Sequence, residues 1–280
     1  MRFQHDIKVL CKVLSVNRST YYKHYSSEPA DRTKENQEIS RVILRIYADY
    51  NKRLGAYKIA YVLQRDYGIN ISVGRVYRLM KTLQLPRMST EKPLRNYRHK
   101  DNGPCTNHLH QEFNQKAPNL VWISDITYIR VAGKWYYLCI VMDLFSRKVI
   151  AWSISGRPGV DLVMHAFQKA YTKRKQPQGL MFHSDRGTQY TALAFRKLLD
   201  SLNVVQSFSK KGYPFDNACC ECFFKYLKKE ETNRRTYHSL EELKSSVFEY
   251  IEGFYNSRRP HGSLGMLTPN QKEELFWNQV

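Results

Sequence analysis

The chain has 280 residues, of which 42% are hydrophobic, which allows one to three folded domains and excludes a disordered polypeptide. The longest apolar stretch is far shorter than a membrane span, and no secretory signal is recognisable, so we expect a soluble, cytoplasmic protein without membrane contact. The formal net charge of +20 exceeds what solubility requires and predicts a nucleic-acid partner. Residues 1–104 carry +12 of this charge, which places the more basic part at the N-terminus.

The first elements in chain order are helices. Apolar residues at helical spacing begin at Ile7 and define a helical segment over 1–25, followed by a polar linker over 26–34. Three helices are predicted within 38–85, with Ser72 as the N-cap of the third. The short connection between the second and third is typical of a helix-turn-helix DNA-binding region. We expect three basic residues of the third helix to contact DNA: Arg75, Arg78 and Lys81.

The amino-acid composition changes after this helical region. Residues 86–118 contain four prolines and many basic residues, and they predict an extended basic linker. Segments rich in β-branched and aromatic residues then predict three antiparallel strands joined by short turns, at 121–130, 134–144 and 148–155. Helices and strands alternate afterwards: helix 161–171, strand 180–183, helix 191–202, strand 204–208, helix 218–231 and helix 240–255.

This order predicts an α/β fold of the ribonuclease H-like type, with a mixed sheet and helices on both faces. We assign residues 119–235 to this catalytic core and 236–280 to a C-terminal helical segment. In such a fold, Asp125 in the first strand, Asp185 after the fourth strand and Glu221 in the helix from 218 converge. Carboxylates brought together repel one another unless a cation neutralises them. Hard oxygen ligands suit two Mg²⁺ ions, or Mn²⁺, which serve phosphoryl transfer.

The helix from 218 to 231 is expected to present its acidic residue together with basic ones. Glu221, Lys225 and Lys228 fall at i, i+4 and i+7 on one face, whereas Lys229 points elsewhere. An apolar stripe lies beside them: Cys220, Phe224 and Leu227. We expect Lys225 and Lys228 to face DNA. Further residues expected to bind DNA lie near the acidic ones in sequence: Arg186, Gln189, Lys210 and Lys211.

Several residues have alternative interpretations. Asp143 competes with Asp125 as a ligand, but we expect it at the end of the second strand in a structural role. His183 could act as a base, but we favour a role in supporting the metal ligands or in contacting DNA. Asp216 is first a candidate helix cap. The tryptophans are expected in the core: Trp122, Trp135 and Trp152.

The cysteines raise the question of zinc. Six cysteines are scattered along the chain and form no disulfide framework, which is typical of a reducing compartment. Two groups resemble parts of a zinc site: Cys105 with His108 and His110, and Cys219 with Cys220 and Cys222. Neither has a second ligand pair at finger spacing, and the second group reads more naturally as small core residues.

At the acidic residues the sequence resembles a known family, the bacterial insertion-sequence transposases of the "IS three" family with a retroviral-integrase-like core. The resemblance rests on a series of short motifs in order: Trp122-x-x-Asp125-Ile126-Thr127-Tyr128, Asp143-x-Phe145-Ser146-Arg147, His183 to Tyr190, Asp216-Asn217-Ala218-x-x-Glu221, Phe223-Phe224-x-x-Leu227-Lys228 and Tyr255-Asn256-x-x-Arg259-Pro260-His261. The 35 residues between Asp185 and Glu221 match the family's spacing. Cys222 departs from it, since the family often has Ser there.

The resemblance implies that Asp125, Asp185 and Glu221 are the catalytic, metal-binding triad and that Lys228 is the family's basic residue. It implies hydrolysis at an element end to expose a 3′-OH, which then attacks target DNA, within a homo-multimer on double-stranded DNA in the bacterial nucleoid. The catalytic chain of this family is often fused to an upstream helix-turn-helix and coiled-coil segment. Two rivals remain: a nuclease of the same fold, and a DNA-binding regulator descended from a transposase.

Overall fold

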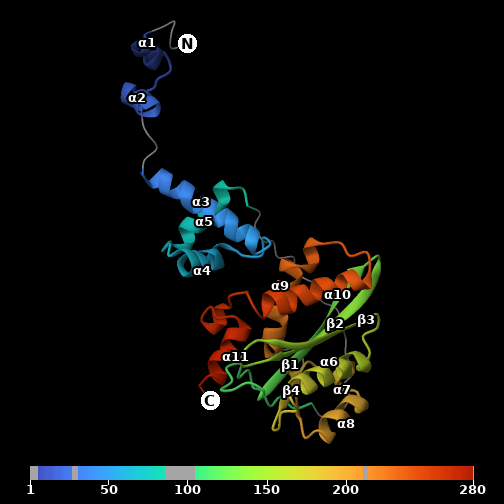
Figure 1. Cartoon of the computed structure of the whole chain (residues 1–280). Coiled ribbons are helices and arrows are strands. Elements are labelled where there is room, and N and C mark those ends of the chain that lie inside the picture. The colour runs from blue at the N-terminus through green and yellow to red at the C-terminus, as the bar shows by residue number, and fades with distance from the viewer. Residues whose placement is uncertain (1–5, 27–30, 86–104, 211–213, 280) are drawn as a thin grey trace. The chain divides into compact units, whose positions relative to one another are not determined.

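The computed structural model describes residues 6–26, 31–85, 105–210 and 214–279 (Figure 1). The chain divides into two compact units, one within residues 1–87 and one within 88–280. Each unit buries its own set of apolar side chains. In the part of the chain that is described, no helix combines the length and the apolar character needed to cross a membrane.

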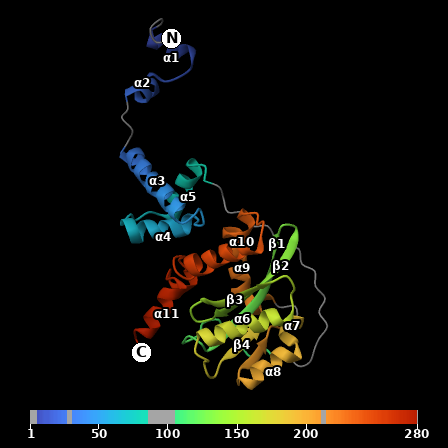
Figure 2. The same ribbon diagram turned by 45° about the vertical axis from the view of Figure 1, so that its right-hand side comes forward.

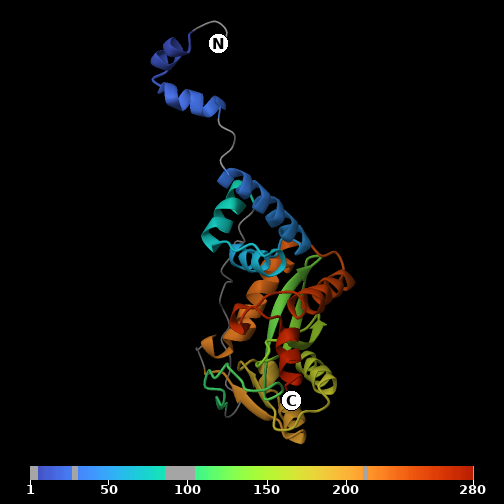
Figure 3. The ribbon, with the colours of Figure 1, turned by 60° about the vertical axis from the view of Figure 1, so that its left-hand side comes forward.

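The first unit is helical. It contains α1 (Ile7–Val13), α2 (Arg18–Ser26), α3 (Asp31–Asp49), α4 (Ala56–Tyr67) and α5 (Val73–Thr82). The last three bury a shared apolar core, and Figure 3 shows them in blue to teal. Ser72 caps α5, because its Oγ accepts the N–H of Arg75 at 3.3 Å. The predicted linker over 26–34 is wrong for residues 31–34, which already belong to α3.

The second unit is built on a five-stranded mixed sheet in the order β3-β2-β1-β4-β5 (Figure 2). β1 (Val121–Val131), β2 (Lys134–Asp143) and β3 (Val149–Ser155) are antiparallel. β4 (Met181–Ser184) and β5 (Val205–Phe208) continue the sheet in parallel with β1. Three antiparallel strands followed by two parallel ones make the ribonuclease H-like fold that the sequence predicts.

Tight turns fix the register of the antiparallel strands. Ala132 and Gly133 both have positive φ, 45° and 82°, as a two-residue hairpin turn matched to strand twist requires. This turn pairs Val131 with Lys134 and places Arg130 opposite Trp135. Because side chains alternate along a strand, Ser124, Ile126, Tyr128 and Arg130 share one face of β1, and Asp125 belongs to the other.

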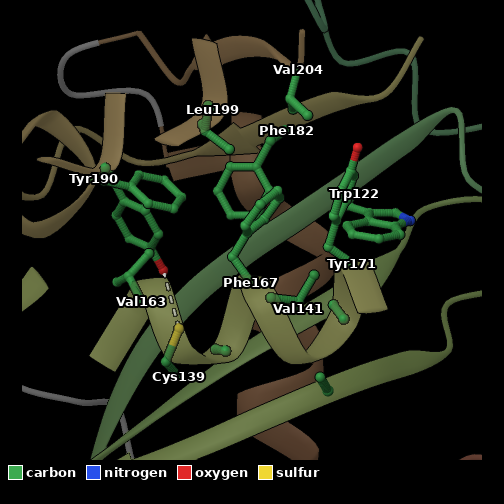
Figure 4. Packing of buried hydrophobic residues seen from close by; sticks show 14 of the residues in the cluster. Trp122, Cys139, Val141, Val163, Phe167, Tyr171, Phe182, Tyr190, Leu199 and Val204 are labelled. Carbon is green, nitrogen blue, oxygen red and sulfur yellow. Dashed lines mark hydrogen bonds between the residues drawn. The ribbon is translucent and has the colours of Figure 1, made fainter. Parts of the chain in front are cut away.

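Helices cover both faces of the sheet (Figures 1 and 2). α6 (Val160–Lys173), α7 (Thr188–Thr191) and α8 (Leu193–Ser201) cover the face that carries Trp122 and Cys139. There Phe167 packs edge-to-face against Phe182 and Phe195, and the Tyr190 hydroxyl points to the Cys139 sulfur (Figure 4). α9 (Ala218–Glu230) and α10 (Leu240–Phe248) lie on the other side of the sheet. The chain ends with α11 (Pro269–Trp277), and the remaining turns are η1 (Pro214–Asn217), η2 (Thr232–Arg234), the π-helical η3 (Glu249–Tyr255) and η4 (Gly262–Leu264).

The described part of the predicted linker, residues 105–118, differs from the expectation of an extended segment. The N–H of Phe208 donates to Thr106 O at 2.8 Å, and the N–H of His108 donates to Ser207 Oγ at 2.9 Å. Residues 105–118 therefore begin beside β5 and belong to the second unit. Residues 86–104 of the predicted linker lie outside the described residues.

Candidate active site

Two of the predicted carboxylates come together through the parallel pairing of β1 with β4. Ile123 lies beside His183 in this pairing. Continuing the register by two positions brings Asp125 beside Asp185, which follows the last residue of β4. Neighbouring strands lie about 4.8 Å apart, so the two aspartates start from adjacent backbone positions. Both side chains are partly buried.

The turn after β4 is built around the Asp185 carboxylate. Asp185 Oδ1 accepts the N–H of Gly187 at 3.0 Å. A Cβ on Gly187 would lie 3.0 Å from that same oxygen and 2.9 Å from Gln189 Oε1. The φ of Gly187 is −57°, which any residue adopts. Glycine therefore leaves space here for the Asp185 carboxylate and the Gln189 amide, and the backbone angle does not require it.

Glu221 is brought to the same edge of the sheet by the start of α9. Asn217 Nδ2 donates to Ser124 O at 3.1 Å and so ties the N-terminus of α9 to β1 beside Asp125. Glu221 lies one helical turn further and is exposed. Asn217 is the N-cap residue of α9 and makes no side-chain capping hydrogen bond, so the capping role predicted for Asp216 is wrong. Asp216 instead accepts from Asn107 Nδ2 at 2.9 Å, Gln111 Nε2 at 2.7 Å and the N–H of Lys210 at 2.8 Å.

The electrostatics of Asp125 reflect its acidic neighbours. Burial raises the pKa of Asp125 well above its usual range, and the negative charges of Asp185 and Glu221 raise it further. The N–H of Ile126 donates to Asp125 Oδ1 at 2.8 Å, and this bond and the ammonium of Lys228 both lower the pKa. Their effect is smaller than the increase, so the pKa of Asp125 stays raised. A divalent cation would remove this repulsion. In the described residues, no group of three His, Cys, Asp or Glu side chains is already arranged to hold a metal ion.

Lys228 lies on the same side of α9 as the acidic residue, as predicted. Its Nζ is 4.8 Å from the centre of the Tyr128 ring, and burial lowers its pKa while Asp125 raises it. Lys225 is exposed one turn before it, and the stripe of Cys220, Phe224 and Leu227 is buried. α9 therefore packs through its apolar stripe and leaves the predicted acidic and basic residues at the surface or the edge of the sheet.

Two alternatives from the sequence are resolved by their contacts. Asp143 is fully buried at the end of β2, and its two oxygens accept the N–H groups of Asn119 at 2.8 Å and Phe145 at 2.9 Å. This is the structural role expected of it. His183 is also fully buried, with Nδ1 2.8 Å from Ser207 Oγ and Nε2 3.2 Å from Ser209 Oγ. The suggested DNA contact by His183 is therefore wrong.

Several predicted DNA-binding residues make contacts within the protein. Arg186 Nε donates to Ser209 O at 2.9 Å, and Gln189 Nε2 donates to Pro158 O at 2.8 Å. Arg75 pairs with Glu35 at 2.6 Å. Three others have exposed side chains: Arg78, Lys81 and Lys210. Lys211 lies outside the described residues.

A buried ion pair that the sequence analysis missed anchors α9 from its other end. Glu230 and Arg259 are each 3% exposed, and the guanidinium binds both carboxylate oxygens, at 2.7 and 2.8 Å. The Tyr250 hydroxyl donates to Glu230 Oε2 at 2.8 Å. Asn256 pairs with both backbone groups of Val149 in the same way that a neighbouring strand would. The signal was present, because Asn256 and Arg259 belong to the last of the short motifs.

The predicted core role of the tryptophans holds for Trp122, which is fully buried, but is wrong for Trp135, which is 50% exposed. Trp152 is partly buried. Among the cysteines, Cys139 and Cys220 are buried core residues, and burial raises the pKa of Cys139 to about 12. All six cysteines are free thiols.

Comparison with known proteins gives three family matches. Models described as "Integrase core domain" match residues 115–214 and 221–275, and one described as "HTH-like domain" matches residues 34–92. The catalytic core domain of HTLV-2 integrase superimposes with a TM-score of 0.42 at 17% identity, over 56% of this chain and 98% of that domain. The fold assignment itself rests on the strand order and the family models.

Curated relatives match nearly the whole chain. Transposase InsF of insertion sequence IS3A from Escherichia coli (strain K12) is 36% identical over 272 residues, 96% of this chain and 94% of the relative. The transposase of insertion sequence element IS904 from Lactococcus lactis is 34% identical, over 88% of this chain and 97% of the relative. Putative transposase InsK of element IS150 from Escherichia coli (strain K12) is 34% identical over 269 residues. The chain therefore belongs to the IS3 family of transposases, polynucleotidyl transferases of the DDE type with an integrase core and a helix-turn-helix region.

Proposed function

We propose that this chain cuts the ends of its DNA element to expose a 3′-OH and joins that 3′-OH to target DNA, with Asp125, Asp185 and Glu221 as the catalytic triad. One observation carries the proposal: the register of β1 and β4 brings Asp125 beside Asp185, where burial and the charges of Asp185 and Glu221 raise the pKa of Asp125. Acidic groups that disfavour one another's charged form in this way suit a bound cation.

The donor set fits Mg²⁺ or Mn²⁺. Carboxylate oxygens are hard ligands, and three of them leave room for water and phosphate, whereas the buried Cys139 and Cys220 are set apart as core residues. Two bound ions would supply activation of the attacking oxygen and stabilisation of the leaving one. Asp125 lies within β1 and Asp185 directly follows β4, and Glu221 would complete the set from the first turns of α9.

The two steps use the same residues on different nucleophiles. In the first, water attacks the phosphorus at the element end, and the 3′-oxygen of the element leaves as the 3′-OH. In the second, this 3′-OH attacks a target phosphodiester, and the target's own 3′-oxygen leaves. Lys228, beside Asp125, positions the terminal DNA, and Lys225 extends the basic face. We also assign double-stranded DNA contacts to Arg186 and Gln189, which lie close to Asp185, and to five basic residues elsewhere in the chain: Arg75, Arg78, Lys81, Lys210 and Lys211.

Joining two element ends to one target requires more than one active site, so we propose that a homo-multimer assembles on DNA. The fusion to an upstream helix-turn-helix and coiled-coil segment, which is expected from the resemblance, is part of the same proposal. Size measurement of the chain with and without paired element ends, together with inspection of the reading frame upstream of the gene, tests both.

The direct test uses a labelled duplex carrying the terminal inverted repeat found beside the gene. With Mg²⁺ or Mn²⁺ we expect cleavage at the element end and transfer of the label to a target plasmid, and with EDTA we expect neither. Cleavage without transfer would identify the rival nuclease. Binding without cleavage, in the chain supplied with its upstream partner, would identify the rival regulator.

A further inference from the structure

An exposed group of aromatic and basic side chains lies on the β1–β2 hairpin beside the candidate active site. Tyr128 is 43% exposed and Trp135 is 50% exposed. Their rings meet edge-to-face with centres 5.2 Å apart. Arg130 lies 5.9 Å from the centre of the Trp135 ring, and Lys228 lies 4.8 Å from that of Tyr128. We name these four residues the hairpin platform.

The hairpin platform is held in place by the sheet. Arg130 and Trp135 are directly opposite each other, and Tyr128 is the diagonal neighbour of Trp135 on the same face. The tight turn at Ala132 and Gly133 fixes this register. Large aromatic rings in a rigid frame that remain half exposed are costly to leave in water, and edge-to-face packing leaves the face of one ring open.

The position of the hairpin platform relative to the carboxylates limits what it binds. Tyr128 follows Asp125 by three strand residues, about 10 Å along β1, and its side chain starts from the opposite face of that strand. That span corresponds to about three stacked bases at 3.4 Å each. Lys228 connects the two places, because its ammonium contacts the Tyr128 ring and also responds to the charge of Asp125.

We propose that the hairpin platform binds unpaired bases at the end of the element DNA, within about three positions of the phosphate that is cut. This inference rests on the proposed function. Aromatic rings bind bases by stacking, and stacking requires bases released from their pairs. Arg130 and Lys228 supply positive charge for the phosphates on either side of the stacked bases. A terminal base pair is the one that opens most readily, since only one neighbour stacks on it.

Both the chemistry and the position of the hairpin platform favour the DNA of the element end as its ligand. An apolar protein partner would meet two cations at the ends of the aromatic pair, whereas a nucleic-acid strand presents a ring and a phosphate at each step. Target DNA is attacked away from its ends and offers paired bases. The element end is the DNA that must lie in the site in both chemical steps.

The test compares the affinity of the full chain for three duplexes that carry the terminal repeat. One is fully paired, one has its last three base pairs mismatched, and one has three mismatches at an internal position. We expect the wild type to bind the end-mismatched duplex about 5- to 100-fold more tightly than the paired one, as stacking of one base implies. A Tyr128→Ala/Trp135→Ala double variant should lose this preference.

Two further variants keep the test specific. Tyr128→Phe/Trp135→Phe preserves the rings and should preserve the preference. Trp277→Ala removes an equally exposed tryptophan, 51%, from α11 and should also preserve it. A wild type with equal affinity for paired and end-mismatched duplexes, or with an equal preference for the internal mismatch, would overturn the hairpin platform while leaving cleavage untouched. A wild type that shows the preference and never cleaves would overturn the proposed function alone.

Discussion

Two sets of buried or partly buried carboxylates in the second unit are treated in opposite ways. Glu230 and Glu273 each face arginine: Glu230 binds Arg259 in two places, and Glu273 binds Arg174, Lys148 and Ser146. Although burial alone would raise the pKa of Glu273, the bond and charge of Arg174 lower it. At Asp125 the pKa is instead raised, by burial and by Asp185 and Glu221.

The difference separates acids that hold the fold from acids that perform chemistry. Glu230 and Glu273 are each neutralised by an arginine of the protein itself. At Asp125, burial and the two neighbouring carboxylates disfavour the charged form, and an external divalent cation would stabilise it. The following predictions test whether this division is real.

The largest effect is expected in the triad. Asp125→Asn, Asp185→Asn and Glu221→Gln should each reduce cleavage by more than about 100-fold. This exceeds the loss of activity expected when a residue that only hydrogen-bonds to a metal ligand is replaced. DNA binding should stay nearly intact, and the free energy of unfolding should not fall, because each change removes a repelling charge. Gel-based cleavage and thermal melting measure the two. A folded Asp125→Asn variant that cleaves normally would break the comparison.

The opposite pattern is expected at the buried ion pair. Arg259→Met leaves the Glu230 carboxylate buried with only the Tyr250 hydroxyl, so the free energy of unfolding should fall by about 3–5 kcal/mol. Adding Glu230→Gln to this variant should restore most of it, because no unpaired charge remains. Cleavage per folded molecule should change little in either. Denaturant titration measures this free energy. An Arg259→Met variant as stable as the wild type would show that the Glu230–Arg259 ion pair does not stabilise the fold.

His183 sharpens the comparison, since it is near Asp185 in sequence but is held by two serines. Burial lowers its pKa from 6.5 to about 4, although the charge of Asp216 acts to raise it. The unfolded chain therefore binds more protons between these values, and stability falls as the pH drops from 6.5 to 4, by about 3 kcal/mol. His183→Gln should show a flatter pH dependence in denaturant titrations at pH 7, 6, 5 and 4. Parallel curves for the two proteins would mean that the pKa of the His183 ring is the same in the folded and the unfolded chain.

The smallest effect is expected at Asp143. Its pKa is raised to about 6 by burial, and two backbone N–H groups stabilise its charged form. In Asp143→Asn one of these donors loses its acceptor, which costs about 1–3 kcal/mol, offset in part by removal of a buried charge. Cleavage should remain appreciable in the folded variant. Inactivity of folded Asp143→Asn, beside an active Asp125→Asn, would transfer the ligand role to Asp143.

Local patterns were sufficient to predict much of this molecule. Alternation and short turns predicted β1 to β3, and helical spacing predicted α3, α4, α5 and the buried stripe of α9. The adjacency of Asp125 and Asp185 followed from strand order, because β1 and β4 are parallel neighbours and the residue after β4 lies beside the middle of β1. Boundaries were predicted less well: the helix predicted over 191–202 is α8, the short α7 before it was not predicted, and the helix predicted over 240–255 ends in a π-helical segment.

Long-range contacts were beyond the sequence. Asp216 was read as a cap because its neighbours allow one, but its acceptors are used by Asn107 and Gln111, more than 100 positions away. Arg75 similarly pairs with Glu35, 40 positions away. The exposure of Trp135 depends on where α6 stops covering the sheet. Such hydrogen-bond partners and exposures depend on which distant side chains the fold brings together, and the periodicity of the sequence does not predict them.

Metal binding tests the central claim most directly, because it does not depend on a particular DNA substrate. Mn²⁺ binding can be followed by calorimetry and by the rise in melting temperature of the full chain. Wild type, Asp143→Asn and Glu230→Gln should bind Mn²⁺ alike, while Asp125→Asn, Asp185→Asn and Glu221→Gln should each lose most of the binding. Loss in Asp143→Asn with full binding in the three triad variants would contradict the division between structural and metal-binding acids.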